Sequence, residues 1–186
     1  HPGLIRIFAA KDVPGENCFG VIAPLADQPV FAEAETRFRG EAVAAVVGET
    51  EAVEAVDLTE FPVRWEVLPA CLTLDEALAD GADLVHAGRA SNVLVRGRVV
   101  KGDAERALAT AHTVAEGEFE TGFVEHAYIE PEAGFARRDG DRIFIQACTQ
   151  SPYLDRDDTA KILGIPPENV RIVPSAVGGG FGAKLD

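Results

Sequence analysis

A run of three glycines near the carboxyl-terminal end constrains this chain more than any other feature. Gly178, Gly179 and Gly180 open the segment Gly-Gly-Gly-Phe-Gly-Ala-Lys, which ends at Lys184 and follows a predicted strand. Glycines carry no side chains, so the backbone can turn with positive φ and approach a bulky ligand closely. Their amide groups can also form a concave anion-binding surface. The segment therefore predicts either a ligand-binding loop or a tight turn that binds nothing.

The same segment partly matches a dinucleotide-binding fingerprint. Gly178, Gly180 and Ala183 satisfy the loose pattern G-x-G-x-x-A. That fingerprint also requires a following helix and an acidic residue about 20 positions further on, which this sequence does not include. A dinucleotide-binding oxidoreductase domain stays open as an alternative.

Charge and hydropathy disfavour two classes of partner. The 186 residues carry a formal net charge of −14 and a mean hydropathy of +0.04. Strong negative charge without a cluster of Lys and Arg disfavours nucleic acid. No apolar run approaches the roughly 18–20 residues of a membrane-spanning helix. We therefore expect no nucleic acid partner and no membrane span.

Three cysteines stand far apart in the sequence: Cys18, Cys71 and Cys148. Their odd number and wide spacing predict neither a disulfide framework nor a paired metal or iron–sulfur motif. We therefore expect a reducing, cytoplasmic location. The chain begins His1-Pro2 without a start methionine and stops inside the glycine-rich segment, so we expect a piece of a longer protein.

The first 80 residues predict a small α+β module. Leu4–Ala10 and Glu41–Val47 have the branched, apolar pattern of strands, and Thr50–Val56 follows the second as a helix capped by its first residue. Pro62–Leu68 alternates apolar and polar residues, which predicts a third strand, and Leu74–Leu78 predicts a short helix.

The remaining residues predict a connecting segment followed by a second α+β region. Asp139-Gly140 between two alternating runs is a hairpin signal. The expected elements of this region are a helix over Ala104–Ala111, a strand over Thr113–Phe119, hairpin strands over Ala133–Ala136 and Arg142–Ala147, a helix over Asp155–Leu163 and a strand over Asn169–Val173.

Several segments resemble the large subunit of the molybdenum hydroxylases, the xanthine dehydrogenase and aldehyde oxidase family, in the order that family has them. Lys11–Asn17, Phe38–Ala44 and Arg64–Pro69 are similar to its α/β hammerhead domain. The resemblance implies an α+β chain with an N-terminally incomplete hammerhead-like domain over residues 1–80 and a linker over 81–102.

The second half resembles the opening of that family's molybdopterin-binding domain. The similar segments are Glu125–Pro131, Cys148–Tyr153 and Val177–Lys184. The resemblance implies that residues 103–186 form the first part of a mixed α+β molybdopterin-binding domain.

The resemblance also implies roles for individual residues. Gln150 matches a glutamine whose amide hydrogen-bonds an oxo group on molybdenum, a role that suits an NH₂ donor. Its alternative is a polar residue at a strand end that bonds backbone. The residues that match the loop against the metal centre and pterin are Gly179, Gly180, Phe181 and Gly182. Phe181 could instead be a core aromatic.

No direct protein ligand to the metal is expected. In the resembling family a pterin dithiolene holds the molybdenum, and the general base is a glutamate that would lie downstream of Asp186. His126 and Glu130 stand four residues apart, which is compatible with metal ligation, but a hydrogen-bonded structural pair fits better because Pro131 indicates a turn.

The implied activity is the hydroxylation of an aldehyde or N-heterocyclic substrate with oxygen from water. The implied cofactor is molybdopterin, plain or as a dinucleotide, with iron–sulfur clusters and flavin on other domains or subunits of an oligomer. Leu185 departs from the pattern because purine-oxidising members have a glutamate there, which puts a purine substrate in doubt. We expect no turnover from these residues alone. A non-catalytic partner-binding module remains an alternative.

Overall fold

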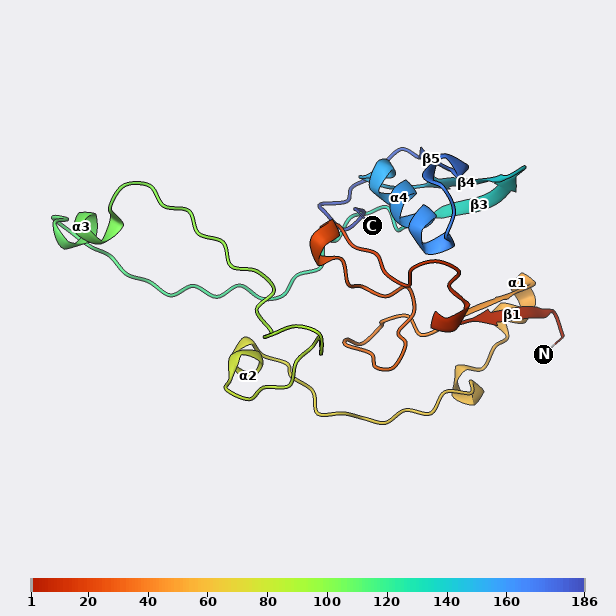
Figure 1. The fold of residues 1–186 in the computed structure, drawn as a ribbon, viewed down its shortest axis with the longest axis horizontal. Coiled ribbons are helices and arrows are strands. Elements are labelled where there is room, and N and C mark those ends of the chain that lie inside the picture. Colours follow the sequence, from red (N-terminus) through yellow and green to blue (C-terminus); the bar gives the residue numbers. More distant parts are fainter. Residues whose placement is uncertain (1, 186) are drawn as a thin grey trace. The chain divides into compact units, whose positions relative to one another are not determined.

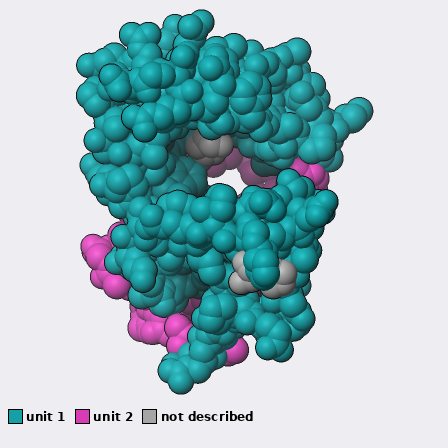
Figure 2. Space-filling view, turned by 90° about the vertical axis from the view of Figure 1, so that its right-hand side faces the viewer, with its two compact units in different colours: residues 1–66, 126–186 teal, residues 67–125 magenta. Residues whose placement is uncertain are grey.

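The computed structural model describes residues 2–185 and divides into two compact units. The first unit joins residues 1–66 to residues 126–186, and the second comprises residues 67–125 (Figure 2). The units are groups of mutual contacts. The expected domain boundaries near residues 80 and 103, and the hammerhead assignment, stay predictions.

The N-terminal part of the first unit is built on a two-stranded sheet. β1 (Leu4–Phe8) pairs antiparallel with β2 (Ala45–Gly48), and α1 (Thr50–Glu54) follows β2 (Figure 1). All three elements lie where the sequence predicts them. The predicted Thr50 cap is wrong: Gly48 still pairs with β1, so Glu49 is the N-cap and Thr50 is already helical.

The C-terminal part of the first unit is a three-stranded sheet with one helix. β3 (Gly134–Asp139) and β4 (Arg142–Ala147) form the predicted antiparallel hairpin, and Gly140 takes the positive φ of 62° that its turn requires. β5 (Val170–Pro174) pairs parallel with β4. A parallel pair needs a crossover connection, and α4 (Pro152–Leu163) supplies it (Figure 1).

The carboxyl-terminal end of α4 carries a junction with the N-terminal part of the same unit. The amide of Gly15 donates to the carbonyl of Ile162 at 2.8 Å, and the amide of Glu16 donates to the carbonyl of Lys161 at 3.1 Å. The last carbonyls of a helix have no partner within it. The turn predicted at Lys11–Asn17 therefore satisfies the end of α4.

Short 3₁₀ helices connect these elements. They are η1 (Ala10–Asp12), η2 (Ala23–Leu25), η3 (Leu58–Glu60) and η4 (Pro167–Asn169).

The second unit contains two short helices, both predicted. They are α2 (Leu74–Leu78), which begins with a capping box between Thr73 and Glu76, and α3 (Ala104–Ala109). The strand predicted over Thr113–Phe119 is wrong, as is the one over Pro62–Leu68 in the chain leading into this unit. Neither segment pairs with a strand, because alternation sets the direction of side chains but cannot supply a neighbouring strand.

Candidate cofactor-binding site

Gln150 lies in the short connection between β4 and α4. The strand ends at Ala147 and the helix begins at Pro152. The buried side chain of Thr149 accepts a hydrogen bond from the amide of Ser151 at 2.9 Å, which fixes this turn. Gln150 is thereby held just beyond the carboxyl end of β4, the central strand of the sheet, and is exposed.

The structure brings Gln150 together with the glycine-rich loop, residues 177–184. The side-chain oxygen Oε1 of Gln150 accepts the amide of Gly182 at 3.1 Å and the amide of Lys184 at 3.3 Å. The amide of Gln150 donates in return to the carbonyl of Lys184 at 2.7 Å. The loop and the glutamine therefore form one hydrogen-bonded assembly, although 32 positions separate Gln150 from Gly182.

Gly180 is required where this assembly is tightest. A Cβ at Gly180 would overlap the Oε1 atom of Gln150 and lie 2.6 Å from its Cδ atom. Real Cβ atoms do not approach neighbours so closely. A side chain at this position would displace the amide of Gln150, so the missing side chain serves contact between the loop and Gln150.

The Gln150 amide keeps two donors available. Its Oε1 atom accepts two backbone amides, whereas its NH₂ group has no hydrogen-bond partner within residues 2–185. A side-chain amide offers two N–H donors on nitrogen and an acceptor on oxygen. The group that Gln150 presents beyond the loop is therefore a donor.

Phe181 stands at the strained tip of the loop. Its φ is 53°, in the left-handed region that non-glycine residues rarely adopt, and Gly179 and Gly182 beside it have φ of 110° and 102°. The amide of Ala183 closes the turn on the carbonyl of Gly180 at 3.0 Å. The phenyl side chain is 77% exposed, so Phe181 is not a core aromatic of this chain.

Two residues that sequence reasoning left without a role in the loop hold its ends. Lys184 has a fully buried side chain, and its Nζ atom lies 2.9 Å from Glu130 Oε2 and 2.8 Å from the Glu130 carbonyl. Glu130 Oε2 also accepts the amide of Gly178 at 2.7 Å. This hydrogen bond, followed by the Lys184 ammonium, lowers the pKa of the Glu130 carboxyl.

The pair expected between His126 and Glu130 is wrong. The Glu130 carboxylate instead contacts Gly178 and Lys184, and Lys184 also lies 4.4 Å from the centre of the Tyr128 ring. A lysine 54 positions away bonds the Glu130 carboxylate, in place of the hydrogen bond expected from the neighbouring histidine. The spacing of Glu130 along the chain gave no signal of this.

Sequence comparison places this loop in a known family. Residues 85–186 match the molybdopterin cofactor-binding domain. This chain belongs to that family.

The relatives of this molybdopterin cofactor-binding domain include dehydrogenase subunits. The chain is 38% identical over 98% of its length to a probable xanthine dehydrogenase subunit of Bacillus subtilis, covering 24% of that protein. It is 31% identical over 99% of its length to the nicotinate dehydrogenase large molybdopterin subunit of Eubacterium barkeri, covering 43%. The chain thus spans less than half the length of these relatives.

Solved structures agree with this membership. The aldehyde oxidoreductase of Desulfovibrio gigas superposes with a TM-score of 0.84 at 29% identity, over 98% of this chain and 21% of that one. The mixed α/β arrangement of residues 2–185, with its two small sheets, is therefore similar to that of molybdenum hydroxylase structures.

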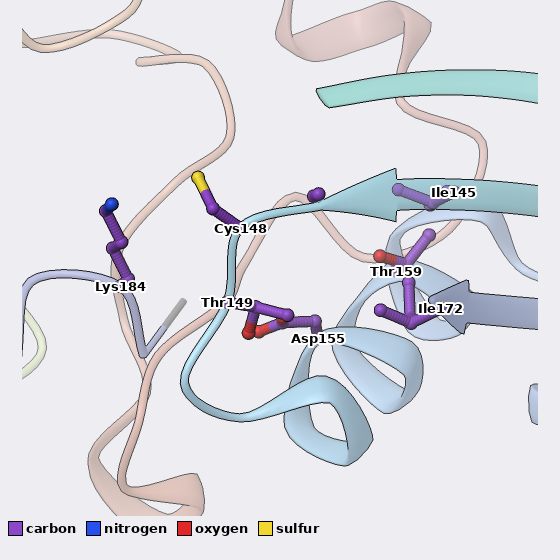
Figure 3. Close-up of a pocket in the computed structure, with 8 residues that line it drawn as sticks. Ile145, Cys148, Thr149, Asp155, Thr159, Ile172 and Lys184 are labelled. Atoms are coloured by element: carbon purple, nitrogen blue, oxygen red, sulfur yellow. The ribbon is translucent and has the colours of Figure 1, made fainter. Parts of the chain in front are cut away.

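A small pocket lies next to Lys184, at the end of the glycine-rich loop. Its volume is about 220 Å³, and Figure 3 shows its lining side chains around the end of β4 and the start of α4. Cys148, Thr149 and Lys184 line it, whereas Gln150 and Phe181 do not. Cofactor pockets commonly need about 300–1,000 Å³. The exposed side of the loop, with Gln150 and Phe181, is therefore the better candidate surface for a large cofactor.

Two further features are absent from the part of the chain that the structure describes. Within residues 2–185, no group of three or more His, Cys, Asp and Glu side chains is placed to hold a metal ion. No helix in the same range is long and apolar enough to cross a membrane.

Proposed function

We propose that this chain supplies the glycine loop and Gln150 to the molybdopterin site of an oxidoreductase that hydroxylates an aldehyde or N-heterocycle with oxygen from water. One observation carries the proposal: the loop amides occupy the Gln150 oxygen and leave its NH₂ group available to a ligand. A donor held in this way suits a cofactor rich in oxygen acceptors. The cofactor, when bound, supplies the redox chemistry of the hydroxylation.

The residues of the loop fit such a group. Gly180 is buried and lets the loop lie directly on Gln150, while Gly179 and Gly182 hold the turn with positive φ. Phe181 presents an exposed ring at the tip, where an apolar face can exclude water from a bound pterin. The roles of these residues are to bind and orient the cofactor, and the catalytic base comes from residues outside this chain.

The hydrogen bonds of the loop count against the dinucleotide alternative. That alternative needs free backbone amides to bind a pyrophosphate. The amides of Gly178, Gly182 and Lys184 already bind the side chains of Glu130 and Gln150. The amide of Ala183 binds the Gly180 carbonyl. Four donors of the loop are therefore committed within the chain, and the glycines serve close approach instead of phosphate binding.

The wider assembly follows from the same proposal. Both relatives are named as parts of larger enzymes, one as a dehydrogenase subunit and the other as a large molybdopterin subunit. We infer that this protein works with iron–sulfur and flavin groups on other domains or subunits, in the cytoplasm, and as an oligomer. Leu185 places an apolar side chain directly after Lys184. It cannot hydrogen-bond a purine ring, which favours an aldehyde or a simpler N-heterocycle as substrate.

Metal analysis of the full-length protein, purified with the subunits that accompany it, tests the proposal. We expect molybdenum in about equimolar amount with this chain, and a molybdenum content at least several-fold lower in the Phe181→Asp variant. Gly88→Ala is the matched control, because a Cβ there meets no atom within 4 Å. An active preparation that contains no molybdenum would overturn the proposal.

A further inference from the structure

Both ends of the glycine loop are tied to one side chain. The Oε2 atom of Glu130 accepts the amide of Gly178 at 2.7 Å, where the loop begins, and the ammonium of Lys184 at 2.9 Å, where it ends. The Lys184 ammonium also donates to the Glu130 carbonyl at 2.8 Å. Glu130 thus closes the loop into a ring of contacts.

The backbone of Lys184 also forms two hydrogen bonds with Gln150. Its carbonyl accepts the Gln150 amide at 2.7 Å, and its own amide donates to Gln150 Oε1 at 3.3 Å. The backbone of Lys184 therefore holds Gln150 while its side chain holds Glu130. A shift at one contact is transmitted to the other because both belong to one residue.

We propose that the Lys184–Glu130 pair is a positioning device that fixes the orientation of the Gln150 side-chain amide. With the loop closed, the amides of Gly182 and Lys184 face Oε1, so the NH₂ group is the one presented outward. An amide rotated by half a turn would present an acceptor instead of a donor. The pair determines which of the two the cofactor meets. The role of Gln150 toward the cofactor rests on the proposed function; the coupling between Lys184 and Gln150 does not.

The burial of the Lys184–Glu130 pair explains why it can fix the loop geometry when a surface ion pair cannot. The side chain of Lys184 is 0% exposed, and that of Glu130 is 34% exposed. A buried ammonium that loses its partner stays uncompensated, so it strongly favours the one loop geometry that provides a carboxylate. Arg137 and Asp139 form the contrasting pair, with side chains 55% and 61% exposed and 4.0 Å between the charged atoms. Such an exposed pair does little to fix the local geometry of the chain.

Hydrogen–deuterium exchange of the full-length protein tests the coupling without requiring the cofactor. The amides of Gly182 and Lys184, resolved by fragmentation, report the Gln150 contact. We expect Lys184→Met to accelerate the exchange of Gly182 about tenfold, since the hydrogen bond to Gln150 is lost. In the Gln150→Ala background the same substitution should add less than about twofold, because the acceptor is already absent.

Other variants separate positioning from a general loss of structure. Glu130→Gln keeps an acceptor oxygen and removes the charge, so a smaller rise of about threefold, confined to residues 177–185, is expected. Asp139→Asn, the matched control, should leave the loop amides unchanged.

Several results would overturn the proposal. The first is unchanged exchange at Gly182 in Lys184→Met. The second is an equal acceleration of Gly182 exchange by Lys184→Met with and without the Gln150 side chain. The third is a rise in exchange spread evenly over β3 and β4 in both Lys184→Met and Glu130→Gln. An active preparation without molybdenum would overturn the proposed function and leave this coupling to be decided by the exchange data alone.

Discussion

Among the glycines of this chain that are pressed against neighbouring atoms, Gly15 and Gly180 differ in the kind of atom that they meet. A Cβ at Gly15 would overlap the carbonyl of Lys161 and lie 2.7 Å from the amide of Gly164, both backbone atoms at the end of α4. A Cβ at Gly180 would meet the side chain of Gln150. Backbone fixed by a helix cannot give way, whereas a side chain can rotate. The first glycine therefore serves the fold and the second serves the site.

The largest effect is expected at the first of these glycines. Gly15→Ala should lower the free energy of unfolding by about 3 kcal/mol, because overpacking against backbone also breaks the hydrogen bond from Gly15 to Ile162. Urea unfolding followed by circular dichroism measures this. Gly88→Ala serves as the control, since a Cβ there has open space. A loss below about 0.5 kcal/mol would mean that the end of α4 moves freely.

The ionic contact at the same junction sharpens this point. Lys161 and Glu16 lie 3.1 Å apart with side chains 34% and 68% exposed. Glu16→Gln should change the free energy of unfolding by no more than about 0.5 kcal/mol, as exposed ion pairs contribute little. The close backbone contact, not the charge beside it, would then hold the two segments together.

At Gly180, the second of these glycines, we expect a small loss of stability and a large loss of cofactor binding. Gly180→Ala should lower the free energy of unfolding by only about 1 kcal/mol, because the Gln150 side chain can rotate away. The same rotation removes the donor from the cofactor surface, so molybdenum content should fall several-fold. Metal analysis and urea unfolding of one preparation give both values. Equal losses at Gly15 and Gly180 would remove the distinction between the two sites.

A smaller and opposite effect on stability is expected at the tip of the loop. Phe181→Gly relieves a positive φ of 53° that costs about 1–2 kcal/mol, and adds backbone entropy to the unfolded chain worth about 0.5–1 kcal/mol. The net result should be a gain of about 0.5 kcal/mol in the free energy of unfolding. Cofactor retention should fall at the same time, because the exposed ring is lost. A destabilised variant would show that Phe181 packs within the chain.

The sequence was sufficient for the elements whose signals are local. The Asp139-Gly140 hairpin, the helix ending at Gly164 and the strand after it all form where turn and cap chemistry predict them. The predicted strands over Pro62–Leu68 and Thr113–Phe119 are wrong for one reason. Whether an alternating segment becomes a strand depends on a partner elsewhere in the fold, and that partner leaves no mark on the segment itself.

The residues of the site also differ in whether a local sequence signal could identify them. Glycine spacing and the family resemblance identified Gln150 and Gly179 to Gly182 as a candidate site, and the structure places Gln150 against Gly180 and Gly182. The function of Glu130 was missed because its partner, Lys184, lies 54 positions away. From sequence, a lysine at the end of a glycine loop resembles a solvated charge. Only the fold shows that its side chain is buried.

The smallest effect concerns the pH dependence of the loop, and it distinguishes the Glu130 contacts from the rigid junction at Gly15. The Gly178 amide and the Lys184 ammonium lower the pKa of Glu130 from its ordinary value of 4.5. A carboxyl with a lowered folded-state pKa stabilises the fold above its unfolded pKa, and this contribution disappears as pH falls through the folded value. The melting temperature of the unmodified protein should therefore exceed that of Glu130→Gln near neutral pH, and the difference should shrink below about pH 4.5.

The Asp139→Asn control should show a smaller difference throughout because its pair is exposed. A difference that grows toward acid would mean that Glu130 is protonated in the folded loop, and the ring of contacts through Lys184 would then have no charge to close it.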